Sequence, residues 1–240
     1  MAPTDKDSSR WRSLLLVVAA VNIVVTLVIQ LLLAGTVIPP LIVFLVLYAV
    51  GIALVRRAGK AGPVMVGVVS VLFVLGNLPF VVQDLSYPSS FLVFSTTFAA
   101  LVAAIVGVVA MVGFLRAWPS AAAGRLGVAA VVVLVLGVGL SVLASLFVSN
   151  EGAEPGDLAL KASNIEFDPR ALQAKAGPLG VHVGNEDLSR HTFTIEALGV
   201  DLEVPAGKSR RVEFDARPGT YTFTCEVNGH EDMKGTLTVQ

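Results

Sequence analysis

The chain has 240 residues, of which 55% are hydrophobic and 15% are charged, and it carries a formal net charge of −1. With a mean hydropathy of +0.78, this composition excludes an ordinary soluble domain and indicates a membrane protein. The single cysteine excludes a disulfide within the chain.

Charge is distributed unevenly along the sequence. Residues 1–148 contain eight Lys or Arg and three Asp or Glu, whereas residues 149–240 contain nine Lys or Arg and fifteen Asp or Glu. The first part is therefore basic and hydrophobic, and the second part is acidic. This change in composition predicts a transmembrane domain at 1–148 and a separate domain in the remainder.

Long apolar runs in the first part predict membrane-spanning helices, because about 20 apolar residues in helical form cross the hydrocarbon core. We identify five such runs, at 13–34, 37–55, 63–83, 90–115 and 126–148. The first run leaves a second interpretation open, namely a cleaved signal peptide. Its length and the lack of a convincing Ala-x-Ala cleavage site favour a retained span.

The loops between the predicted spans predict an orientation. Basic residues are confined to the N-terminus and to alternate loops: Lys6, Arg10, Arg12, Arg56, Arg57, Lys60, Arg116 and Arg125. By the positive-inside rule, the N-terminus lies in the cytoplasm. Five crossings then place the acidic part outside the cytoplasm, so we predict a multi-pass protein of the cell membrane with an extracytoplasmic C-terminal domain.

The acidic part begins with a predicted linker, 149–157, and continues as a predicted domain at 158–240. In this domain short segments alternate apolar and polar residues between turn residues, and the roughly seven segments are typical of a β-sandwich. The stretch at 218–227, PGTYTFTCEV, shows the alternation clearly. We therefore predict a fold of five transmembrane helices followed by a Greek-key β-sandwich.

Strand parity separates the histidines of this domain, because residues two apart in a strand share a face. His191 shares its face with Phe193 and Ile195, so it is predicted to point inward. Cys225 shares its face with Phe223 and is also predicted to point inward. His182 stands between two inward valines and is predicted to face solvent.

The stretch CEVNGHEDM at 225–233 brings together Cys225, His230 and Met233 in a chain with one Cys, three His and four Met. Taken singly, a buried Cys, a strand His or a core Met is more often structural than a metal ligand. Together with His191, however, the four form the ligand set of a blue copper centre, two His and one Cys with a weak axial Met. The sequence therefore predicts a metal site made of His191, Cys225, His230 and Met233.

At these residues the chain resembles the cupredoxin family of type 1 copper domains, which includes plastocyanin and azurin. The resemblance covers roughly 157–240, including N-E-D before H-T-F-T-I and P-G-T-Y-T-F-T-C-x₄-H-x₂-M-x-G-T-L-T-V. It implies one mononuclear type 1 copper with His191, Cys225 and His230 as equatorial ligands and Met233 as the axial ligand. The spacing from His230 to Met233 is short for the family.

Four protein ligands leave no open position for a substrate, so we predict an electron carrier and no enzyme, with no catalytic residues. An alternative is a module that captures, delivers or senses copper, and a third is a metal-free domain that acts in complex assembly. Among partners we expect membrane lipid and a redox protein, such as a cytochrome or a membrane oxidase or reductase, and no nucleic acid. Acidic residues beside His230 either dock on a basic patch of that redox protein or are merely solvated.

Overall fold

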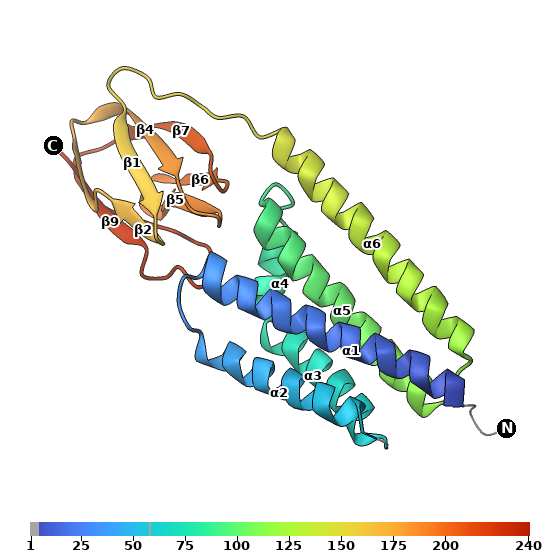
Figure 1. Ribbon diagram of the computed structural model, residues 1–240. Helices are drawn as coiled ribbons and strands as arrows, with labels where there is room; N and C mark the ends of the chain where they lie inside the picture. Colours follow the sequence, from blue (N-terminus) through green and yellow to red (C-terminus); the bar gives the residue numbers. More distant parts are fainter. Residues whose placement is uncertain (1–4, 58) are drawn as a thin grey trace. The chain divides into compact units, whose positions relative to one another are not determined.

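The computed structural model describes residues 5–57 and 59–240 (Figure 1). The chain divides into two compact units, Met1–Ser86 with Phe94–Leu140 and Tyr87–Val93 with Ser141–Gln240. Helices make up the first part of the sequence and strands make up the second, as the change in hydrophobic pattern predicts.

In the residues that the structure describes, six α-helices form on the apolar runs. They are α1 (Asp5–Val28), extended by a π-helix (Ile29–Leu33), α2 (Pro39–Val55), α3 (Ala61–Gly76), α4 (Leu78–Leu85), α5 (Phe91–Leu115) and α6 (Ser120–Leu146). Two prolines occupy the first turn of α2, where the missing N–H groups have no helical partner to lose.

The prediction of five membrane spans is not supported. By length and composition, three helices in the described part of the chain can cross a membrane, Ser8–Leu33, Phe91–Leu115 and Ser120–Leu146. A fourth is added if α3 and α4 count as one bent span. Helix α2 has 17 residues and is about 26 Å long at 1.5 Å per residue, which is less than the hydrocarbon core of about 30 Å.

The predicted span at 63–83 is wrong as a single helix, because it bends by 70° between α3 and α4. Asn77 leaves the helical conformation at the bend, with φ −114° and ψ 16°, and its side-chain amide donates to Phe73 O at 2.7 Å. Pro79 follows in the first turn of α4. A proline has no N–H and its ring clashes with the carbonyl four residues earlier, so a proline at this position kinks or breaks a helix.

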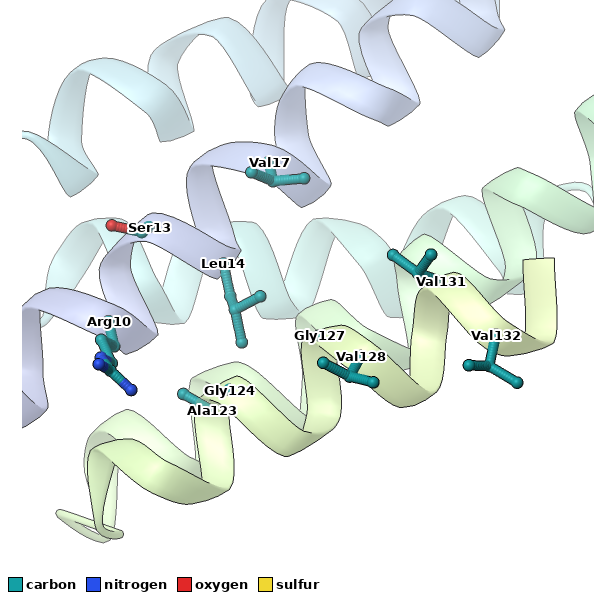
Figure 2. A pocket seen from close by; sticks show the side chains of 10 residues that line it. All are labelled: Arg10, Ser13, Leu14, Val17, Ala123, Gly124, Gly127, Val128, Val131 and Val132. Carbon is teal, nitrogen blue, oxygen red and sulfur yellow. The ribbon is translucent and has the colours of Figure 1, made fainter. Parts of the chain in front are cut away.

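A groove of about 520 Å³ lies between α1 and α6 (Figure 2). Its lining is apolar apart from Arg10 and Ser13, and consists of Arg10, Ser13, Leu14, Val17, Ala123, Gly124, Gly127, Val128, Val131 and Val132. A Cβ on Gly127 would stand 3.5 Å from the side chain of Leu14, an ordinary van der Waals distance, so the two helices come close at this point. The lining contains no His, Cys, Met or acidic side chain, so this groove is not a metal site.

The second part of the chain is a β-sandwich, which we call the β-domain. Its nine strands in the described residues are β1 (Leu158–Ser163), β2 (Glu166–Asp168), β3 (Ala171–Ala174), β4 (Gly177–Asn185), β5 (His191–Ile195), β6 (Val200–Val204), β7 (Ser209–Ala216), β8 (Gly219–Thr224) and β9 (Lys234–Val239). One sheet has the order β2-β1-β4-β7 and the other β3-β9-β8-β5-β6. Most neighbours are antiparallel, but β1 pairs with β4 and β3 with β9 in parallel.

The core of the β-domain lies between the two sheets and is built from the inward positions of the alternating strands. Phe167, Phe193 and Phe223 are fully or almost fully buried, and their rings meet edge-on or tilted with centroids 5.2 to 6.5 Å apart. Phe193 and Phe223 each stand two residues from a predicted ligand. The same alternation that fills the core therefore turns His191 and Cys225 inward.

The predicted linker is bound to the β-domain by hydrogen bonds and an ion pair. Glu151 N donates to Ser209 O at 2.9 Å, and Glu151 Oε2 accepts from Arg211 N at 2.7 Å. Arg211 also forms an ion pair with Asp157, with 2.8 Å between Nε and Oδ2. Residues 151–157 thus lie along strand β7.

Candidate metal centre

Three of the four predicted ligands converge at one end of the β-domain. His191 begins β5, Cys225 follows β8, and His230 lies in the loop that leads to β9. Their ligating atoms all lie within 4.8 Å of one another, and all three residues are buried. Within residues 5–57 and 59–240, these three side chains form the one group of at least three His, Cys, Asp or Glu that is close enough to hold a metal ion.

The separations of the donor atoms fit a single metal ion. Cys225 Sγ lies 3.7 Å from His191 Nδ1 and 3.6 Å from His230 Nδ1. With metal–nitrogen and metal–sulfur bonds of about 2.0 and 2.3 Å, a trigonal angle of 120° places nitrogen and sulfur about 3.7 Å apart. The donor set and its spacing therefore suit a trigonal His₂Cys site.

Met233 is buried, with 1% of its surface exposed, and belongs to the core of the β-domain. Its backbone closes the ligand loop, since Met233 N donates to His230 O at 2.8 Å and Cys225 N donates to Met233 O at 3.0 Å. A further bond runs from His230 N to Val227 O at 3.0 Å. These bonds hold the loop that carries Cys225 and His230 in a fixed shape.

Thr192 joins the two segments that carry the ligands, a role that the sequence analysis missed. Its N–H donates to Cys225 Sγ at 3.4 Å, and its Oγ1 accepts from Glu226 N at 2.8 Å. Thr192 therefore ties the start of β5, which carries His191, to the segment that carries Cys225. Its position directly after His191 was the only signal for it in the sequence.

The electrostatics of the site favour neutral ligands. Burial raises the pKa of the Cys225 thiol, lowers that of His191, and lowers that of His230 to about 4, with the neighbouring His191 adding to the effect on His230. Both imidazoles are thus uncharged at neutral pH and offer Nδ1 lone pairs. Because the metal ligand is the thiolate, metal binding is expected to release the proton of Cys225.

We expect acid to destabilise the metal-free β-domain between pH 6.5 and about 4. The pKa of His230 is depressed in the folded state, so the unfolded chain binds a proton in this range that the folded chain does not. The free energy of unfolding therefore has its full value above pH 6.5. It falls as the pH decreases toward 4, by up to about 3 kcal/mol from the titration of His230. Amide hydrogen exchange of the metal-free protein at pH 7.5 and 5.0 measures the loss, and His230→Gln should flatten it.

His182 lies on the face of β4 opposite to the buried Val181 and Val183, as its parity predicts, but it is partly covered and does not stand freely in solvent. It is half-buried, and its Nε2 lies 3.0 Å from Glu151 O, on the segment along β7. His182→Ala is expected to leave copper affinity and the visible spectrum of the loaded protein unchanged. A spectrum that shifts in this variant would contradict the assignment of the site to the other two histidines.

Comparison with known proteins identifies the family of the β-domain. A family model described as cupredoxin-like domain matches residues 132–239. The C-terminal part of the chain therefore contains a cupredoxin-like domain with a buried His–Cys–His group, placed after a helical region with several candidate spans.

Solved structures similar to this chain include copper proteins. A reduced amicyanin variant is 19% identical, with 37% of this chain and 86% of that chain covered and a TM-score of 0.32. A copper-containing nitrite reductase from Thermus scotoductus is 22% identical over 39% of this chain and 24% of that one, with a TM-score of 0.30. The metal-binding domain of the Cu(I)-exporting P-type ATPase of Streptococcus pneumoniae is 19% identical over 38% and 94%, with a TM-score of 0.32.

Proposed function

We propose that the β-domain is a membrane-anchored type 1 copper protein that carries single electrons, with His191, Cys225 and His230 as equatorial ligands and Met233 as the axial one. The observation that carries this proposal is the buried convergence of two Nδ1 atoms and one Sγ atom at 3.6 and 3.7 Å. Bound copper would supply a one-electron couple between Cu(I) and Cu(II).

The ligands are held by the fold, and this favours electron transfer over catalysis. His191 is fixed in a strand, and Thr192 and the bonds around Met233 fix the loop that carries Cys225 and His230. Ligands that cannot rearrange impose the same surroundings on both oxidation states, so little reorganisation accompanies the gain or loss of an electron. All four donors come from the protein, which leaves no open position of the kind that catalytic metal sites keep.

His230 is the side chain through which we propose that electrons enter and leave. It is 8% exposed, whereas His191 is fully buried. The exposed acidic side chains of Glu226, Glu231 and Asp232 lie on the same short segment. Opposite charge on a redox partner would speed its approach, so a partner with a basic patch fits this end of the β-domain.

The sequence pattern supports an extracytoplasmic position for the β-domain. Helix α6 is one of the helices that can cross a membrane, and Arg116 and Arg125 lie before and within its first turns. By the positive-inside rule this end of α6 lies in the cytoplasm. The β-domain, which follows the other end of α6, would then lie on the outer side.

Retention of copper through a redox cycle separates a carrier from the alternative, a module that handles copper. The copper-loaded full-length protein, in detergent, is reduced with ascorbate and then exposed to a Cu(I) chelator. A carrier is expected to keep its copper on the timescale of reduction and reoxidation. Rapid transfer of Cu(I) to the chelator would instead support capture or delivery and would contradict the proposal.

A further inference from the structure

Asp187, in the loop between β4 and β5, contacts a predicted ligand directly. Its Oδ2 lies 2.8 Å from Nε2 of His191, and 82% of the Asp187 side chain is shielded from solvent, since 18% is exposed. An ionised carboxylate only accepts hydrogen bonds, so this contact requires the proton of the imidazole on Nε2. The lone pair of Nδ1 is then free on the side that faces Cys225 Sγ.

The same carboxylate holds a turn of the sheet that lies opposite to the strand of His191. Asn164 N donates to Asp187 Oδ1 at 2.7 Å, and Ile165 N donates to Asp187 Oδ2 at 3.0 Å. These two residues form the turn between β1 and β2, with φ of 56° and 59°. Such turns favour Asn-Gly, and a β-branched residue is unfavourable at positive φ. The two bonds to Asp187 therefore stabilise a turn whose own sequence does not suit it.

Asn185 fixes the loop that presents Asp187. Its Oδ1 accepts from Asp187 N at 2.9 Å, and its Nδ2 donates to Ser189 O at 2.8 Å and to Val204 O at 3.0 Å. The side chain of Asn185 is buried. Asn185 therefore fixes the backbone of Asp187, while Asn164 N and Ile165 N fix its carboxylate.

The pKa of Asp187 agrees with an ionised carboxylate. Although burial acts to raise the pKa, the hydrogen bonds from Ile165 N, Asn164 N and His191 outweigh it and lower the pKa below its ordinary value. The acceptor role that the distances indicate therefore holds at neutral pH.

From this network we infer that Asp187 is a positioning residue of the metal centre: it fixes the Nε2–H tautomer and the ring orientation of His191 and connects that ligand to the β1–β2 turn of the other sheet. The role in copper binding rests on the proposed function. The tautomer and the ring orientation, in contrast, are properties of the metal-free chain. Partners of this kind orient ligand imidazoles and raise their basicity.

The test replaces Asp187 by alanine in the full-length protein. The chain has three histidines, so selective ¹⁵N labelling of histidine gives a spectrum simple enough to assign with His182→Gln and His230→Gln. In metal-free wild type, His191 is expected as the Nε2–H tautomer, and in Asp187→Ala as a mixture of tautomers. Cu(II) affinity is expected to fall by about 10- to 100-fold.

Two controls separate positioning from folding. Glu186→Ala removes the neighbouring carboxylate, which pairs with Lys161 Nζ at 2.7 Å, and should change neither the tautomer nor the affinity. Ile165→Gly places a glycine at the positive φ of the turn, so the turn no longer needs the hydrogen bonds to Asp187 for its stability. Combined with Asp187→Ala, it should restore stability while the tautomer mixture and the weaker copper binding persist.

An unchanged tautomer in Asp187→Ala, or a double variant that regains wild-type copper affinity, would overturn the inference. A failure of the proposed function has a different signature. In that case the metal-free protein would still show the tautomer change, but the copper-loaded wild type would lack the properties of a type 1 centre.

Discussion

Cys225→Ser is expected to abolish the intense visible absorption of the copper-loaded protein. The blue colour of a type 1 centre arises from charge transfer between thiolate sulfur and Cu(II), and Cys225 is the single cysteine of the chain. A serine oxygen supplies no comparable transition and is a poor ligand in a site that otherwise offers two imidazoles. We expect loss of the band, together with weaker copper binding measured by competition with a chelator.

The substitution should leave the fold intact, so its effect reports on the site. Cys225 is 5% exposed, and a serine in its place keeps a side chain of similar size whose oxygen can accept the bond from Thr192 N. Far-ultraviolet circular dichroism checks that the sheets persist. Thr224→Ala, at the adjacent outward position of β8, is the matched control and should stay blue. A blue Cys225→Ser protein would disprove the ligand assignment.

Met233→Leu is expected to keep copper and to raise the reduction potential. A thioether donates weakly to Cu(II) from the axial position, and its removal disfavours the oxidised state more than the reduced one. A tenfold change in the relative affinity for the two oxidation states corresponds to about 59 mV. We expect a rise of about this size or larger by voltammetry of the copper-loaded protein.

The exchange suits the packing around Met233, since leucine and methionine differ little in volume and such swaps cost less than about 1.5 kcal/mol. The control is Leu237→Met in β9, which makes the reverse exchange at another fully buried position. This variant should not change the reduction potential. A potential unaltered by Met233→Leu would remove Met233 from the ligand set. Complete loss of copper would show that it is more than a weak axial ligand.

The sequence predicted the orientation of the two ligands that belong to or follow directly on strands, His191 and Cys225. Because alternate residues of a strand share a face, the burial of Phe193 and Phe223 predicts that His191 and Cys225 point inward, and both are buried. His230 lies in a loop, where no periodicity applies. Its place beside Cys225 followed from the motif and agrees with the 3.6 Å between Nδ1 and Sγ.

Asp187 was not predictable in the same way. It is four residues before His191, in a segment that the pattern identifies only as a turn. Its contacts join the β1–β2 turn of one sheet to His191 at the start of a strand in the other sheet. Ile165 and Phe167 alternate with polar residues, a pattern that favours a strand. Ile165 instead lies in the turn, in a conformation that a β-branched residue rarely adopts and that the bonds to Asp187 stabilise.

The number of spans shows the limit of counting apolar residues. Hydropathy treats 63–83 as one run, but the chemistry of two residues, Asn77 and Pro79, breaks it into α3 and α4. The run at 37–55 is apolar throughout yet forms a helix of 17 residues. Length and composition locate hydrophobic helices well, whereas the place where a helix ends depends on single residues that a window average hides.

The most direct test of a type 1 electron-carrying centre is the visible spectrum of the full-length protein loaded with Cu(II), recorded through one cycle of reduction by ascorbate and reoxidation by a mild oxidant. We predict an intense blue band that bleaches on reduction and returns at full strength on reoxidation. Copper bound without the band, or a band that does not return, would contradict the account.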